Sequence, residues 1–153
     1  MLSYRGYGLS TGRPSEKGLL IDAQTAIDYL TKTNPATKDT KIVLYGQSLG
    51  GALSIQLANK NQDKISGLIL ENTFRSMRVL IPTAFPPARY LAKMCHQVWP
   101  SETTLPQIKE TPVLFLSGLK DELVPYVKPP RLFFSMEFIE ANSVFHTTID
   151  QII

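Results

Sequence analysis

The hydrophobic positions along the chain predict helices and strands in alternating order. Residues 15–31 repeat apolar side chains every three or four positions, on one face made of Leu19, Ala23, Ala26, Ile27 and Leu30. Ser15 has the side chain expected of the residue that caps such a helix. Short apolar runs predict strands at 41–45, 65–70, 112–117 and 136–140, with a second helix at 49–59. This order is typical of a mostly parallel α/β sheet flanked by helices.

The first predicted strand is apolar throughout, which indicates a strand covered on both faces. Residues 4–14 contain three glycines and a proline and therefore predict a loop. Between residues 74 and 111 the prolines permit only short helices, although the segment is rich in apolar side chains. We expect this segment to be a cap-like helical insertion over the carboxyl ends of the strands, where α/β sheets bind ligands. The alternative is an ordinary crossover helix with a long connection.

Composition narrows the class of protein. The 153 residues, 43% of them hydrophobic, suit one domain spanning residues 1–153. The formal charge of +3 is spread along the chain without a basic run, so we expect no nucleic-acid partner. Cys95 is the only cysteine, so neither an intrachain disulfide nor a thiolate metal cluster can form, and we expect no cofactor. Without an apolar leader or an 18-residue apolar run, the sequence as written indicates an intracellular, cytoplasmic protein with no membrane span.

The segment with the most chemical information is Gly46-Gln47-Ser48-Leu49-Gly50, between a predicted strand and a predicted helix. A Gly-x-Ser-x-Gly sequence in this context predicts a nucleophile elbow, in which a strained turn exposes the serine hydroxyl. Gly46 and Gly50, which lack Cβ atoms, would let the strand and the helix crowd together. The Leu49 amide, at the helix N-terminus, would face a developing oxyanion.

A serine nucleophile needs a histidine base and a carboxylate that orients it, in the chain order serine, acid, histidine in α/β-hydrolases. Asp121 lies a few residues beyond the third predicted strand and is the candidate acid; the alternatives are the adjacent Glu122 as the acid, or an Asp121 that only serves a turn in the loop. His146 is the candidate base, since it follows Asp121 with room for a helix and a strand; a histidine without a catalytic role is the alternative. His96 precedes the acid, so we expect it to have a packing or surface role.

Several separated motifs resemble the α/β-hydrolase domain-containing protein 13 family, which includes the fungal Bem-type hydrolases. They are Tyr4-Arg5-Gly6-Tyr7-Gly8, Pro14-Ser15-Glu16, Gly18-Leu19, Tyr45 to Gly51, Glu71-Asn72-Thr73-Phe74 and Ser117 to Pro125. The resemblance covers roughly residues 4 to 125 and implies a serine hydrolase with Ser48 as nucleophile and Asp121 as acid. Related branches remove palmitate from protein cysteines, which makes a lipid ester or thioester the implied substrate. Many members of the family carry an N-terminal membrane anchor.

The sequence departs from the family pattern at both ends. The resemblance implies several strands before Tyr4, including the strand whose loop supplies a second oxyanion amide, and their absence would expose the edge of the 41–45 strand. His146 lacks the Gly-x-His-Asn setting of the family. We therefore expect a partial α/β-hydrolase fold, truncated at its N-terminus and with an atypical C-terminus.

Three hypotheses follow. The first is a serine hydrolase acting on an ester or thioester, with Ser48, Asp121 and His146 as triad, the Leu49 amide as half of an oxyanion hole, and a small-molecule or acylated substrate. The second is a truncated, catalytically impaired form of such an enzyme. The third is a prolyl-oligopeptidase-like peptidase, since that group shares the Gly-x-Ser-x-Gly-Gly elbow. The sequence leaves the substrate and the oligomeric state open.

Overall fold

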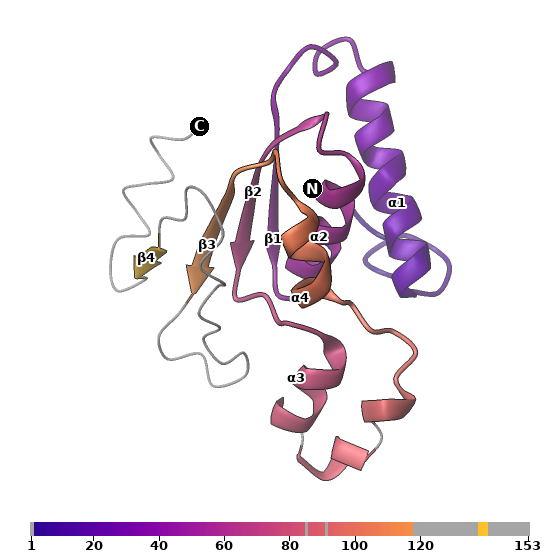
Figure 1. Cartoon of the computed structure of the whole chain (residues 1–153). Coiled ribbons are helices and arrows are strands. Elements are labelled where there is room, and N and C mark those ends of the chain that lie inside the picture. Colours follow the sequence, from indigo (N-terminus) through magenta and orange to yellow (C-terminus); the bar gives the residue numbers. More distant parts are fainter. Residues whose placement is uncertain (1, 85, 91, 118–137, 141–153) are drawn as a thin grey trace.

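A four-stranded parallel sheet forms the centre of the molecule in the computed structural model, which describes residues 2–84, 86–90, 92–117 and 138–140 (Figure 1). The strands are β1 (Ile42–Gln47), β2 (Ile65–Glu71), β3 (Val113–Ser117) and β4 (Phe138–Glu140), in the order β1-β2-β3-β4. All four predicted strands are therefore present, and the predicted parallel α/β sheet is confirmed.

The helices that contact the sheet in the described part of the chain pack against one of its faces. Side chains at alternate strand positions point towards them, namely Ile42, Leu44, Leu68, Leu70, Val113 and Phe115. The central helix is α2 (Leu49–Lys60), which contacts both β1 and β2. Successive right-handed crossovers in one direction along a parallel sheet place every connection on the same face, which accounts for this arrangement.

The opposite face of the sheet carries the other alternate positions of β1, β2 and β3. Val43 and Tyr45 on that face are 55% and 58% exposed. Tyr45 lies beside Ile69, which lies beside Leu114 in turn. The expectation that the first strand is covered on both faces is therefore wrong for the described residues, because the helices that flank β1 all lie on one side of it.

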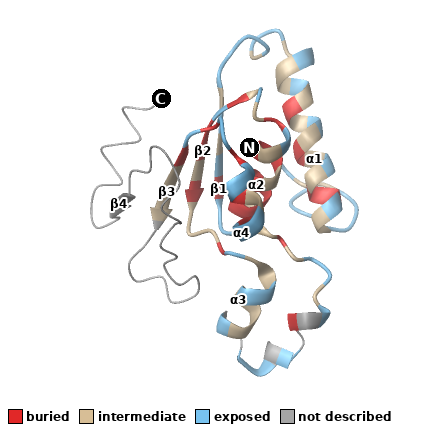
Figure 2. Cartoon of the chain, viewed as in Figure 1, coloured by how far each residue is buried: buried red, intermediate tan, exposed pale blue. Residues whose placement is uncertain are grey.

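Helix α1 (Glu16–Asp28) begins after Ser15, whose hydroxyl oxygen accepts a hydrogen bond from the Gly18 amide at 3.1 Å, as predicted for an N-cap. The helix continues as one π-helical turn at Tyr29–Thr33. Its buried residues pack with α2 in one core cluster: Leu19, Ala23 and Ile27 from α1, Ala52, Leu53 and Leu57 from α2, together with Phe74 and Trp99. The second cluster joins α2 to β2 and β3 (Figure 2).

Two carboxylates fix α1 to distant segments. Asp22 accepts hydrogen bonds from the Arg5 backbone amide at 3.0 Å and from its guanidinium at 2.6 Å, which ties the 4–14 loop to the helix. Glu16 accepts from the Val98 amide at 2.8 Å, from the Trp99 amide at 3.2 Å and from Gln56 Nε2 at 3.1 Å. Glu16 thereby joins α1, α2 and a segment more than eighty positions away in sequence.

Where the structure describes the segment between β2 and β3, its helices are all short, as its prolines predict. They are α3 (Met77–Ala84), 3₁₀ turns at Pro86–Tyr90 and Ala92–Met94, α4 (Ser101–Thr104) and a 3₁₀ turn at Leu105–Gln107. Figure 1 shows α3 and the following turns beyond the carboxyl ends of the strands. Trp99 and Phe74 are buried, whereas Val79 and Met94 are 46% and 71% exposed. A cap function for residues 74–111 stays a prediction.

Candidate active site

Ser48 occupies the turn between β1 and α2 in a backbone conformation that few residues adopt. Its φ and ψ are 50° and −115°, and its side chain is exposed. A non-glycine residue with positive φ is strained and persists only when its surroundings enforce it. Here the Ser48 amide donates to the Glu71 carbonyl at 2.9 Å, and the Ser48 carbonyl accepts from Gly51 at 3.1 Å. The strand, strained turn and helix expected of a nucleophile elbow are all present.

The close approach of β1 and α2 depends on Gly46 and Gly51. A Cβ on Gly46 would lie 2.4 Å from the Gly50 carbonyl oxygen and 2.7 Å from Gly51 Cα. A Cβ on Gly51 would lie 1.8 Å from Thr73 Oγ1, whereas a Cβ on Gly50 would meet no atom of the described residues within 4 Å. The predicted need for a glycine is therefore confirmed at Gly46 but not at Gly50, whose Cβ position is clear of the described residues at the first turn of α2.

Sequence reasoning assigned no steric role to Gly51 or to Thr73. The available signal was the second glycine of the Gly50-Gly51 pair, since a glycine inside a helix costs stability and usually has a packing reason. Its partner Thr73 belongs to a different element, so the contact could not be read from local sequence.

Leu49 is the first residue of α2, and its amide is one of the donors that a helix leaves without an intrahelical acceptor. Such an amide lies at the positive end of the helix dipole and suits a developing negative charge. Ser48 and the Leu49 amide are adjacent along the chain, so the elbow positions both at once.

A polar group lies beside the elbow on the open face of the sheet. The Tyr45 hydroxyl donates to Glu71 Oε2, and Gln47 Nε2 donates to Glu71 Oε1 at 3.2 Å. The hydrogen bond to Glu71 raises the pKa of Tyr45 to about 12. Both oxygens of Glu71 thus serve to join β1 to β2.

The strand register aligns the carboxyl ends that would carry the remaining triad residues. Gln47 pairs with Glu71, Glu71 with Leu116, and Leu116 with Ile139. Ser48 and the end of β3 therefore lie on the same side of the sheet, where the strands have their carboxyl ends, and are separated by two strand spacings, or about 10 Å. The predicted acid Asp121, its alternative Glu122 and the predicted base His146 lie outside the described residues.

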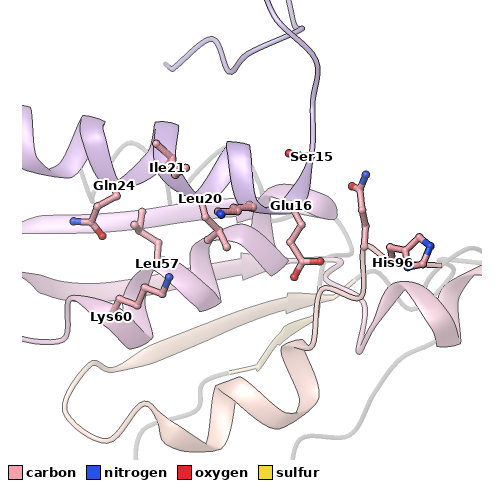
Figure 3. Close-up of a pocket in the computed structure, with 10 residues that line it drawn as sticks. Ser15, Glu16, Leu20, Ile21, Gln24, Leu57, Lys60 and His96 are labelled. Carbon is pink, nitrogen blue, oxygen red and sulfur yellow. The ribbon is translucent and has the colours of Figure 1, made fainter. Parts of the chain in front are cut away.

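His96 lies on an exposed bend and lines a groove between α1 and α2, which agrees with the surface role expected for it. The groove is also lined by Glu16, Leu20, Ile21, Leu57 and Lys60 (Figure 3). Neither Ser48 nor Leu49 lines it. This groove is therefore separate from the elbow.

Comparison with known proteins places these features in context. The family described as serine aminopeptidase, S33, among the hydrolases, matches residues 1–109. The chain is 55% identical over 133 residues to protein bem46 of Schizosaccharomyces pombe, a match that covers 86% of this chain and 43% of that protein. It is 52% identical over 124 residues to an uncharacterized membrane protein of Saccharomyces cerevisiae, covering 80% of this chain and 43% of that protein.

The fold also matches a solved α/β-hydrolase from Vibrio vulnificus, with a TM-score of 0.67, 32% identity, and coverage of 79% of this chain and 46% of that chain. The chain thus spans less than half the length of these relatives. In the part of the chain that the structure describes, no helix has the length and apolar character needed to cross a bilayer.

Proposed function

Because this chain belongs to the α/β-hydrolase superfamily, in the family described as serine aminopeptidase, S33, we propose that it is a serine hydrolase with Ser48 as nucleophile. The observation that carries the proposal is the strained Ser48 backbone, at φ 50° and ψ −115°, between a parallel strand and a helix N-terminus. Strain of this kind concentrates at functional sites.

In the proposed reaction the Ser48 hydroxyl oxygen attacks the carbonyl carbon of an ester or thioester. His146 takes the hydroxyl proton, Asp121 orients the imidazole, and the Leu49 amide donates to the carbonyl oxygen as it becomes negative. Collapse of the tetrahedral intermediate breaks the bond to the alcohol or thiol, which receives the proton from His146. Water then hydrolyses the acyl-enzyme by the same steps. The strand register supports Asp121 as the acid, because it aligns the carboxyl end of β3, which Asp121 follows in sequence, with the end of β1 that carries Ser48.

For the substrate we propose an apolar acyl group. Support comes from the segment after β2, in which α3 and the 3₁₀ turns that follow it lie beyond the carboxyl ends of the strands (Figure 1). Val79 of α3 and Met94 of the turn at Ala92–Met94 are both exposed. Apolar side chains at that edge suit an acyl chain, since binding pockets are predominantly apolar. A series of p-nitrophenyl esters and acyl thioesters of increasing chain length should show kcat/KM rising from short to medium chains.

The decisive test is labelling of the purified chain with a fluorophosphonate, which reacts only with an activated serine. We expect labelling of the wild-type chain, none for Ser48→Ala, and a loss of several orders of magnitude for His146→Ala. His96→Ala is the matched control for the second histidine and should label like the wild type. A folded wild-type chain that does not react would overturn the proposal.

That negative result would instead favour a catalytically impaired form of such a hydrolase. Removing one oxyanion donor lowers kcat by about 10²- to 10³-fold, so loss of a single donor that acts with the Leu49 amide would be enough to make turnover slow. A peptidase is the remaining candidate, because the matching family is described by an aminopeptidase. Cleavage of aminoacyl and prolyl amide substrates at a higher kcat/KM than esters would favour it.

A further inference from the structure

The contact between Thr73 and Gly51 lies directly behind the elbow. Thr73 follows β2, and its side chain occupies the space beside the first turn of α2 that a Cβ on Gly51 would need. That Cβ would be 1.8 Å from Thr73 Oγ1 and 2.9 Å from both Thr73 Cβ and Thr73 Cγ2. Separations under about 3.0 Å do not occur between such atoms, so the helix approaches the end of β2 as closely as a glycine permits.

The turn at residues 71–73, which we call the β2 corner, also binds the backbone of Ser48. The Glu71 carbonyl accepts the Ser48 amide at 2.9 Å and the Thr73 hydroxyl at 3.3 Å, so one oxygen joins the elbow to Thr73. Asn72, between Glu71 and Thr73, has a φ of 43°, a left-handed conformation that asparagine tolerates better than most residues. This turn directs Thr73 back towards α2.

Both sides of the corner are anchored. The Asn72 amide donates to the Leu116 carbonyl of β3 at 3.0 Å, which fixes the turn to the neighbouring strand. Phe74 is 3% exposed and packs in the cluster that also contains Ala52 and Leu53 of α2. Thr73 therefore lies on a short segment whose position is set independently of the Ser48 side chain.

We propose that Thr73 is a positioning residue for the elbow. Its side chain fills the notch left by Gly51 and sets how far the N-terminus of α2 lies from the end of β2. Because α2 begins at Leu49, this separation determines where the Ser48 hydroxyl and the Leu49 amide lie relative to the ends of β2 and β3, and therefore to a bound carbonyl group. The inference rests on the proposed function, since the consequence of misplacing these two groups is lost reactivity. A displacement of about 1 Å at a reacting group costs up to about 10²-fold in rate.

Variants on both sides of the Gly51–Thr73 contact test whether this contact positions Ser48. Gly51→Ala should slow the first-order rate of fluorophosphonate labelling by about 10- to 10²-fold, with little change in the apparent affinity for the probe. The double variant Gly51→Ala with Thr73→Gly removes the opposing atoms, and should recover at least ten-fold of that loss. Thr73→Val keeps the shape without the hydroxyl and should slow labelling less than Thr73→Gly does. The control is Gly50→Ala, whose Cβ would meet no atom of the described residues within 4 Å, and it should label like the wild type.

The amide resonances of Ser48 and Leu49 give a readout that does not need activity. They should shift in Gly51→Ala and in Thr73→Gly, and should shift less in Thr73→Val than in Thr73→Gly, with circular dichroism confirming that each variant is folded. If Gly51→Ala does not fold, Thr73→Gly and the double variant still decide the question, because neither contains the clash.

Thr73→Gly with wild-type labelling rate and unshifted Ser48 and Leu49 amides would overturn the inference, as would a double variant no better than a folded Gly51→Ala. A wild-type chain that fails to label overturns the proposed function instead. In that case the amide shifts alone decide whether Thr73 positions the elbow.

Discussion

Replacing Glu16 with alanine removes the acceptor that joins α1 to the segment before α4. The carboxylate accepts the backbone amides of Val98, at 2.8 Å, and Trp99, at 3.2 Å. A hydrogen bond to a charged group contributes about 1.5–3 kcal/mol, and a buried donor left without an acceptor costs a similar amount. Because Val98 is only half-buried, water can replace part of its bond, so we expect a loss of about 2–4 kcal/mol in the free energy of unfolding.

Trp99 reports this change directly. It is the single tryptophan of the chain, is 1% exposed and has a φ of 48° that the bonds to Glu16 help to hold. Urea unfolding followed by its fluorescence should show a midpoint lower by about 1–2 M, for a slope of about 2 kcal/mol per M. Glu16→Gln, which keeps one acceptor oxygen, should fall between the alanine variant and the wild type.

The matched control is Glu102→Ala. Glu102 is paired with Arg75 on the surface, with side chains 50% and 44% exposed. Exposed ion pairs contribute little to stability, so this variant should unfold almost at the wild-type midpoint. If Glu16→Ala and Glu102→Ala shift the midpoint equally, the reasoning that Glu16 joins two distant segments is refuted.

Two further predictions concern the elbow and the 4–14 loop. Gly46→Ala should lower the free energy of unfolding by about 1–3 kcal/mol and slow the labelling of Ser48, because the new Cβ would lie 2.4 Å from a backbone oxygen. Gly50→Ala should leave the stability unchanged or raise it. Equal thermal midpoints for the two variants would contradict this. Hydrogen bonds from Arg5 lower the pKa of Asp22, so their contribution is present above the unfolded pKa of about 3.9 and is lost as pH falls through the lower folded pKa. Asp22→Asn should therefore flatten the acid side of a plot of stability against pH, and an unchanged acid side would count against the pair.

The sequence predicts the elements of this fold well because their signals are local. The period of α1, its Ser15 cap and the apolar runs of the strands each depend on neighbouring residues, and all appear at nearly the predicted bounds. The Gly-x-Ser-x-Gly motif likewise predicts the strained turn at Ser48.

What the sequence did not predict depends on contacts between distant segments. Glu16 binds amides 82 and 83 positions away, and Gly51 is crowded by Thr73 from another element. The predicted burial of β1 on both faces is also wrong for the described residues. An apolar strand can be buried on both faces, but which face is covered depends on the side of the sheet on which the crossover connections lie.

Ser48, the proposed nucleophile, directly follows β1, the outermost strand of the described sheet, and this placement bears on how a substrate preference could change. Within the described residues β1 pairs only with β2, so its other edge offers a row of backbone donors and acceptors ending at Ser48. Any strand pairing in parallel along that edge would end at the height of Ser48, and the loop that follows it would lie over the hydroxyl. Evolution could then change the length and sequence of such a loop, while the residues after β2 on the other side, which we propose to position Ser48, stay the same.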